Sequence, residues 1–335
     1  KADASTSGGS TPFSTVSETA GLTVTAINDA PTIAHGALLT LPATTEDVPS
    51  TASSVASLLA GASWADVDSG ALQGIAVTDA TGAGTWQYST DGLAWSDFDA
   101  VSASAALLLD ASTLVRYVPD GTQAETATIS FVAWDRSSGT ASTAGSPSTA
   151  NPGAGGGTGA YSSAVAGASL QVTAVNDAPV LDASGTPTLT TISEDDTISA
   201  GDTVATILAS AGGDRLTDVD AGALEGIAVT GLSSGNGSWQ VSIDGGSTWQ
   251  AVGAVSDSSA LLLRDTDRLR FVPDGLNADT ASVSFRGWDQ SGATAGQQGT
   301  KVDASTAGGV TAFSTATETA AITVSAVNDA PTITN

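Results

Sequence analysis

The sequence predicts an all-β protein made of tandem β-sandwich repeats of about 150 residues, arranged end to end. Thirty-eight glycines and a charged fraction of only 13% favour short strands joined by turns over long helices. Long blocks of the chain also recur at a nearly constant offset, as they do in repeat arrays. With 335 residues, the chain is long enough for two complete units, each with its own core.

The repeat is defined by blocks of nearly identical sequence. Residues 66–78 (DVDSGALQGIAVT) match residues 218–230 (DVDAGALEGIAVT) at an offset of 152. Residues 1–34 match residues 301–334, so we expect the chain to open inside a truncated repeat and to be an interior segment of a longer protein. The predicted organisation is the C-terminal part of a preceding repeat at 1–31, a complete sandwich at 32–179, and a second complete sandwich with its closing linker at 180–335.

Alternating apolar and polar residues predict seven or eight short strands in each repeat. The last strand of each unit is expected at residues 21–26, 168–173 and 321–325, where the proline of the boundary sequence Asn-Asp-Ala-Pro then ends pairing. Further strands of the first repeat, with counterparts in the second, are predicted at 73–78, 84–89, 94–98, 114–118 and 128–134.

Two kinds of segment are harder to assign. Residues 55–59 and 204–209 fit either a strand or a helical turn, because short apolar runs do not discriminate between them. Residues 137–163 and 291–313 are rich in glycine, serine and other small or polar residues, and have no apolar period. We expect the first of these to be a long flexible loop and the second to be a similar variable region.

The net charge of −26, from 35 acidic and nine basic residues, excludes several partners. Nucleic acid and anionic lipid surfaces would be repelled, and no apolar run approaches the length of a membrane span. The absence of cysteine excludes disulfides and thiol chemistry. So large an excess of carboxylates favours bound divalent cations, although a charged, soluble surface is the alternative.

Acidic clusters recur near the ends of each repeat: an Asn-Asp pair, then Glu-Asp, then Asp-Val-Asp. Alternate residues of an extended segment point the same way, so Asp-X-Asp can direct two carboxylates at one ion. Calcium requires six to eight oxygen ligands, and several such segments could supply them. Turn capping is the alternative role for these residues. The candidate calcium ligands are Asn28, Asp29, Glu46, Asp66, Asp68, Asp135, Asn176, Asp177, Glu194, Asp218, Asp220, Asp289, Asn328 and Asp329.

Enzyme functions find little support. Residues 242–249 (SIDGGSTW) match the Asp-box hairpin of sialidase-like propellers, but sialidase chemistry needs an arginine cluster and a tyrosine nucleophile. His35 is the only histidine, so a Ser-His-Asp arrangement cannot recur in both repeats. The paired tryptophans of each repeat are expected to pack in the core, although they could instead form a platform for sugars; they are Trp86, Trp95, Trp239 and Trp249.

The Val-Asn-Asp-Ala-Pro boundaries, the Glu-Asp and Asp-Val-Asp clusters and the Trp-Asp strand endings resemble the cadherin-like and immunoglobulin-like tandem repeats of giant bacterial adhesins, many exported by type I secretion. The resemblance implies a Greek-key sandwich in each repeat and calcium ions that stiffen the junctions between repeats. It also implies two ligand sets, one made of Asn28, Asp29, Glu46, Asp66 and Asp68 and the next of Asn176, Asp177, Glu194, Asp218 and Asp220.

The expected function is a non-catalytic extender of a secreted surface protein on a bacterial cell, serving adhesion or biofilm formation. Its expected partners are the neighbouring repeats of the same chain and, in one alternative, other copies of the protein. That alternative is an extracellular filament in which repeats of several chains assemble. A carbohydrate-binding module is the third class, and it would require exposed aromatic rings.

Overall fold

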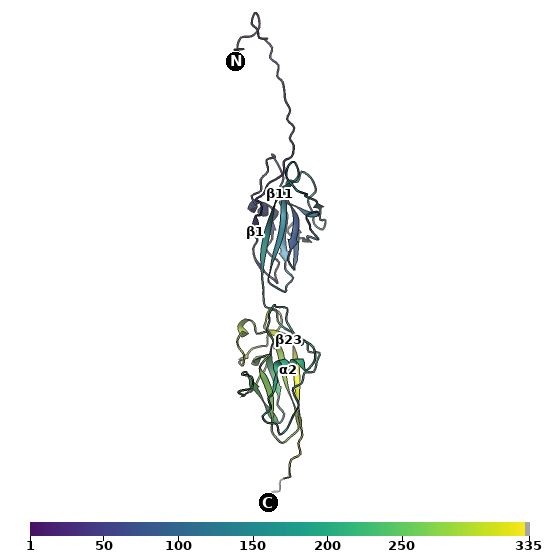
Figure 1. Ribbon diagram of the computed structural model, residues 1–335, viewed down its shortest axis with the longest axis vertical. Helices are drawn as coiled ribbons and strands as arrows, with labels where there is room; N and C mark the ends of the chain where they lie inside the picture. Colours follow the sequence, from purple (N-terminus) through teal and green to yellow (C-terminus); the bar gives the residue numbers. More distant parts are fainter. Residues whose placement is uncertain (332–335) are drawn as a thin grey trace.

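The computed structural model describes residues 1–331 and is nearly all β. Two β-sandwiches follow one another along the long axis of the molecule, and the two chain termini lie at opposite ends (Figure 1). Residues 1–30 precede the first sandwich without forming a strand. Within the described residues, neither helix is long or apolar enough to cross a membrane.

The first sandwich consists of two sheets. The larger has the strand order β1-β11-β9-β4-β7-β10, with β2 also paired to β11, and the smaller has the order β3-β8-β5-β6. The strands are β1 (Leu38–Thr40), β2 (Thr44–Thr45), β3 (Ser53–Ser54), β4 (Gly74–Thr81), β5 (Thr85–Ser89), β6 (Ser96–Asp97), β7 (Ala106–Asp110), β8 (Leu114–Val118), β9 (Glu125–Trp134), β10 (Thr149–Ala150) and β11 (Tyr161–Thr173).

The second sandwich repeats this arrangement. Its sheets have the orders β13-β23-β21-β16-β19-β22 and β14-β20-β17-β18, and β12 pairs with β15 beside them. Its strands are β12 (Val180–Leu181), β13 (Ile192–Ser193), β14 (Asp202–Thr203), β15 (Leu216–Thr217), β16 (Gly226–Ser233), β17 (Gly237–Ser242), β18 (Gln250–Ala251), β19 (Ala260–Arg264), β20 (Arg268–Pro273), β21 (Asp279–Trp288), β22 (Lys301–Val302) and β23 (Phe313–Ser325). A 3-10 turn, η1, covers Gly292–Thr294.

The two segments whose sequence fits either a strand or a helical turn are short helices in the structure, one in each sandwich. They are α1 (Val55–Gly61) and α2 (Val204–Ala209). Ser54 and Thr203 cap them, each side-chain hydroxyl accepting a hydrogen bond from a backbone N–H three residues ahead. Each helix buries its apolar residues against the core.

Each sandwich buries its main core between its two sheets and a second cluster on the outer face of the larger sheet. In the first sandwich, Phe131 and Trp86 belong to the main core, whereas Leu108 and Trp134 belong to the outer cluster. The segment between β9 and β11 covers this outer face, where the Trp134 indole N–H donates to the Ser138 carbonyl at 2.7 Å. The inner strands of the larger sheet are therefore buried on both faces, which accounts for runs such as Ala-Leu-Leu-Leu in β7 and β19.

The structure corrects three expectations. Strands β7 and β19 were not predicted, because a strand buried on both faces lacks alternation. The expected flexible loop at 137–163 instead contributes β10 and the start of β11, and its counterpart at 291–313 contributes η1 and β22. Residues 21–26 form no strand, because no neighbouring strand is present to pair with them.

Separate cores predict separate unfolding transitions. Phe131 and Phe285 are fully buried, one in each sandwich. We expect Phe131→Ala to lower the melting temperature of the first sandwich alone and Phe285→Ala that of the second alone, each by about 10 °C, because the loss of a buried ring costs about 3–5 kcal/mol. Calorimetry would measure both transitions, and a single transition shifted equally by either variant would contradict independent cores.

Candidate metal centre at the junction

The last strand of the first sandwich positions Glu46. β2 pairs in parallel with the end of β11, and Glu46 directly follows β2, so the Glu46 N–H donates to the Thr173 carbonyl at 3.1 Å. The Glu46 side chain turns toward the linker that continues β11, where its Oε1 accepts from the Val175 N–H at 2.6 Å. Glu46 is only 2% exposed. A buried glutamate is thus fixed at the C-terminal end of the first sandwich.

The same linker is fastened to the second sandwich by its next residues. The Asn176 side-chain amide donates to Asp289 Oδ2 at 3.0 Å, and the Asp177 N–H donates to Asp220 Oδ2 at 2.9 Å. The Ala178 N–H donates to the Gly309 carbonyl at 2.7 Å. Consecutive linker residues are therefore bound first by one sandwich and then by the other.

Asp218 and Asp220 come from the turn after β15. The Asp220 N–H donates to Asp218 Oδ1 at 2.8 Å, which closes the Asp-Val-Asp turn and leaves the second oxygen of Asp218 without a hydrogen-bond donor. The first sandwich repeats this turn with Asp66 and Asp68, at 2.9 Å. These aspartates do form turn caps, as the alternative role required, but capping uses only part of their oxygens.

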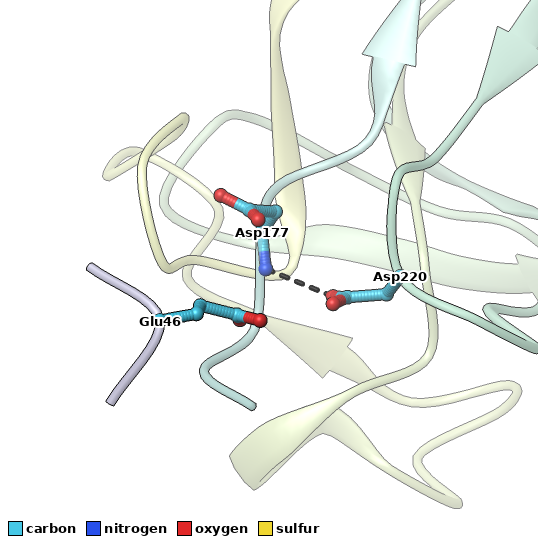
Figure 2. Close-up of side chains that lie close together, drawn as sticks. All are labelled: Glu46, Asp177 and Asp220. Carbon is cyan, nitrogen blue, oxygen red and sulfur yellow. Dashed lines mark hydrogen bonds between the residues drawn. The ribbon is translucent and has the colours of Figure 1, made fainter. Parts of the chain in front are cut away.

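Three carboxylates from different parts of the chain meet at this junction. Glu46, Asp177 and Asp220 each place an oxygen within 4.8 Å of the others (Figure 2). Within residues 1–331, no other three acidic or histidine side chains come together in this way. None of the three ion pairs found in that range includes any of these carboxylates. The cluster therefore lacks a compensating basic side chain.

Several carboxylate oxygens at the junction are buried without a hydrogen-bond partner. Among the described residues, they include Oε2 of Glu46 and Oδ2 of both Asp177 and Asp218. A buried carboxylate oxygen that has lost water and gained no donor is costly, whereas a cation would satisfy it. These oxygens are the strongest sign that the residues suit a metal ion.

The environment of the junction raises the pKa of two of its aspartates. Burial raises the pKa of Asp177, and the nearby charges of Asp220 and Asp47 raise it further. Burial likewise raises the pKa of Asp218, to which the charges of Asp220, Asp289 and Asp177 add. Without a cation, therefore, the folded junction opposes the ionisation of Asp177 and Asp218.

Solvent can reach the junction. An open cleft of about 440 Å³ lies beside the linker, lined by residues 122–124 and 174–176 together with Asp220 and Ala221. Asp220 and Asn176 thus face both the cleft and the carboxylate cluster. One of the three carboxylates of the cluster, Asp220, therefore borders this cleft.

The predicted grouping of the two glutamates is wrong. Glu46 was grouped with Asn28, but it lies at the opposite end of the first sandwich, because β2 runs parallel to β11 and ends where β11 ends. Glu194 was grouped with Asn176, yet its Oε1 accepts from the Val327 N–H at 2.6 Å, beside the third linker. Each glutamate belongs with the linker that leaves its own sandwich.

The structure therefore distributes the candidate ligands over three sets. The junction set, Glu46, Asn176, Asp177, Asp218, Asp220 and Asp289, draws on both sandwiches. The N-terminal set, Asn28, Asp29, Asp66, Asp68 and Asp135, has the same hydrogen bonds as its counterpart in the junction set, among them Asn28 Nδ2 to Asp135 Oδ2 at 2.9 Å and Asp29 N–H to Asp68 Oδ2 at 2.7 Å. The C-terminal set, Glu194, Asn328 and Asp329, contains the glutamate and its linker.

Sequence reasoning missed the glycine turns that hold the linkers. Gly309 accepts from Ala178, and in the first sandwich Gly157 accepts from the Ala30 N–H at 2.8 Å. Both glycines have positive φ, of 56° and 62°, a conformation that favours glycine. The pairs and triplets of glycine inside the expected loops were the available sign of such turns.

Several of the residues considered for other functions make packing or turn contacts. Asp244 of the Asp-box accepts hydrogen bonds from the Thr248 N–H and the Ser242 hydroxyl, which close the hairpin. These bonds lower the pKa of Asp244 to about 2. Trp86 and Trp239 are buried. The guanidinium groups of Arg116 and Arg270 lie 4.0 Å from the ring centres of Trp95 and Trp249, respectively, and thus occupy one face of each ring. His35 is exposed.

Comparison with known proteins finds matches only among solved structures. No protein-family model matches the chain, and no curated protein matches it. An endo-fucoidan hydrolase from glycoside hydrolase family 107 is 13% identical with a TM-score of 0.25, over 94% of this chain and 31% of that chain, so this chain spans about a third of its length. SporoSAG from Toxoplasma gondii is 13% identical with a TM-score of 0.18, over 88% of this chain and 98% of that chain. Neither similarity bears on fold or activity.

Charge repulsion at the junction predicts the effect of neutralising one carboxylate. With EGTA present, we expect Asp218→Asn to raise the melting temperature of the second sandwich, because the folded state no longer has to hold a disfavoured charge. The control, Asp274→Asn, changes a carboxylate whose pKa is lowered by its bonds to Asn277 and the Leu276 N–H, so it should lower that temperature.

The pH dependence of the stability of the second sandwich follows from the raised pKa of Asp218. A folded-state pKa above the unfolded value of 3.8 means that the folded protein binds the proton more tightly. The charge of Asp218 therefore lowers the free energy of unfolding by its full amount above the folded-state pKa. This destabilisation disappears as the pH falls toward the pKa of the unfolded state. The difference in melting temperature between Asp218→Asn and the wild type should shrink over that pH range. A difference that widens on acidification would contradict a raised pKa for Asp218.

Proposed function

We propose that this chain is a non-catalytic spacer in which a calcium ion at the junction of two Greek-key β-sandwich repeats limits their bending. The observation that carries the proposal is the cluster of Glu46, Asp177 and Asp220, whose oxygens lie within 4.8 Å of one another and come from both sandwiches and their linker. One ion bound there would be held by both bodies at once.

The donor set favours calcium over other ions. All the ligands are oxygens, from carboxylates and the carbonyl groups of asparagine or backbone, and no cysteine or second histidine offers a softer donor. The junction set contains five acidic residues and one asparagine, enough for the six to eight oxygens that calcium accepts. Magnesium requires a compact octahedron and keeps several waters, so it fits a set of dispersed, partly fixed carboxylates less well.

The linker explains how calcium binding would limit bending between the two sandwiches. Hydrogen bonds already fasten Val175 to the first sandwich and Asn176, Asp177 and Ala178 to the second. The carboxylates that make these bonds also repel one another, and this repulsion favours opening of the junction. A divalent cation would replace repulsion with shared coordination and hold the existing geometry.

The setting that suits such a spacer is extracellular. Sites of modest affinity are occupied where calcium is present at millimolar concentration, as it is outside cells. The net charge of −26 is compatible with a cation-rich exterior, and the resemblance to repeats of giant bacterial adhesins points to a bacterial surface protein. The partners of each repeat are then its neighbours in the same chain.

A matched pair of glutamate variants tests the calcium site. Glu46→Gln keeps an oxygen that can accept from Val175 but removes the charge, so we expect calcium affinity at the junction to fall about 10-fold or more. Glu194→Gln is the control, because Glu194 meets only the third linker and lies outside the junction set.

Isothermal titration calorimetry with calcium, and with magnesium in parallel, would measure these affinities. The full chain should bind calcium more tightly than magnesium, and the thermal transitions should rise with calcium. Equal affinities for Glu46→Gln and Glu194→Gln, or no calcium binding by the wild type, would refute the proposed site.

A further inference from the structure

The second sandwich has a cavity of about 260 Å³ where the edges of its two sheets face each other. Residues of β13 and β23 from the larger sheet and of β14 and β20 from the smaller sheet line it. Its apolar lining residues are all buried, and they are Leu189, Ile192, Leu269, Phe271 and Ile322. Pockets for drug-sized ligands usually measure about 300–1,000 Å³, so this smaller cavity suits a short length of chain.

The backbone N–H and carbonyl of Phe271 point away from β17. In an antiparallel ladder, the two residues of a pair exchange either two hydrogen bonds or none. Phe271 pairs with Trp239, whose carbonyl accepts from the Val252 N–H at 3.0 Å on the opposite edge of β17, so this pair exchanges none. Within residues 1–331, no other group bonds the Phe271 N–H or carbonyl. β20 thus presents a donor and an acceptor at a residue that lines the cavity.

The first sandwich shows which groups fit this position. Tyr117 is the counterpart of Phe271, and Ser50 binds both of its backbone groups. The Ser50 N–H donates to the Tyr117 carbonyl at 2.8 Å, and the Tyr117 N–H donates to Ser50 Oγ at 2.8 Å. Ser50 is only 6% exposed. A serine beside the strand therefore satisfies this edge position of the repeat.

The corresponding segment of the second sandwich takes a different course. It comprises residues 195–203 and is one residue longer than its counterpart, residues 47–54. Ile198 is 83% exposed, and Ser199 is half-buried and makes no hydrogen bond to Phe271. The position that Ser50 fills in the first sandwich is therefore open to another group.

Two arginines of β20 fix this segment in its course. Arg270 Nη1 donates to the Ser199 carbonyl at 3.0 Å. Arg268 Nη1 donates to the next two carbonyls of the segment, at 3.2 and 3.1 Å. The first sandwich has Leu114 at the position of Arg268, so it cannot form the second set of bonds. These bonds keep the segment away from the backbone of Phe271.

The polar residues of the cavity limit the charge of an occupant. Asp196 and Asp202 line it, whereas the guanidinium of Arg270 is already bound by the Ser199 carbonyl and by Gln240 Oε1, at 3.0 and 2.7 Å. Both oxygens of Asp202 accept from Thr190, which holds two sides of the cavity together. An acidic occupant would be repelled by these carboxylates, whereas a neutral or basic one would not.

From these observations we infer that the cavity binds a short, neutral or basic peptide of another protein, in which a serine or threonine stands next to an apolar residue. The hydroxyl accepts from the Phe271 N–H, and the N–H of the same residue donates to the Phe271 carbonyl, as Ser50 does for Tyr117. The apolar side chain covers Ile192 and Ile322. The site uses no carboxylate of the junction, so it does not depend on the proposed calcium function.

Nuclear magnetic resonance of the full chain in EGTA tests this site. The probe is the capped tetrapeptide Val-Pro-Ser-Thr, the sequence of residues 48–51, and its control is Val-Pro-Ala-Thr. We expect the serine peptide to shift the Phe271 amide and the methyl signals of Ile192 and Ile322 in a saturable way, and to leave the Tyr117 amide unshifted. The alanine peptide should bind about 10-fold more weakly, because it leaves the Phe271 N–H without an acceptor.

A variant of the full chain tests the location of the site. It lacks Ile198 and carries Arg268→Leu, so that the segment has the length found in the first sandwich and β20 has the residue found there. We expect Ser199 to bind the Phe271 backbone in this variant, so that the Phe271 amide exchanges slowly and peptide binding is lost. A retained thermal transition of the second sandwich shows that the variant is folded.

Two results with the wild-type chain would overturn the inference: no shift of Phe271 with the serine peptide, or equal affinities for the two peptides. Hydrogen exchange at the Phe271 amide as slow as at Tyr117, before any peptide is added, would also overturn it, because the chain's own segment would then occupy the position. Peptide binding that persists in the folded variant would place the site elsewhere and contradict it. If the variant does not fold, the two peptides decide alone.

Discussion

The hydrogen bonding of the linker between the sandwiches is the constraint on which the rest of the junction depends. β11 runs without interruption into residues 174–178, whose successive backbone and side-chain amides are bound by Glu46, Asp289, Asp220 and Gly309. The first of these belongs to one sandwich and the other three to the next. The linker is thus hydrogen-bonded by both sandwiches, and these bonds bring carboxylates of both to the junction.

The same arrangement creates the electrostatic problem that a cation would solve. Three of the acceptors that bind the linker are carboxylates, those of Glu46, Asp289 and Asp220, so the bonds that join the sandwiches also concentrate negative charge between them. The carboxylates use one oxygen for a hydrogen bond and leave another buried and unsatisfied, as in Glu46 and Asp218. Hydrogen bonding and ion binding therefore use different oxygens of the same carboxylates, so the two are compatible.

Sequence alone predicted much of this structure, and the failures have physical causes. Alternation located β4, β8 and β9, but not β7, which is buried on both faces. Repetition identified the acidic clusters, but their order in the chain gave the wrong neighbour for Glu46, because a parallel pairing with β11 carries that residue to the far end of its sandwich. Which cluster meets which is a property of strand direction, and no local pattern contains it.

The most direct test of the central claim is the distance between the two sandwiches as a function of bound calcium. Small-angle scattering of the full chain in EGTA, in magnesium and in calcium would give the maximum dimension and the distribution of shapes. We expect a longer particle with a narrower distribution of shapes in calcium alone, and loss of that change in Glu46→Gln. Identical profiles in calcium and EGTA would contradict it, because an ion that does not restrain the junction cannot stiffen the chain.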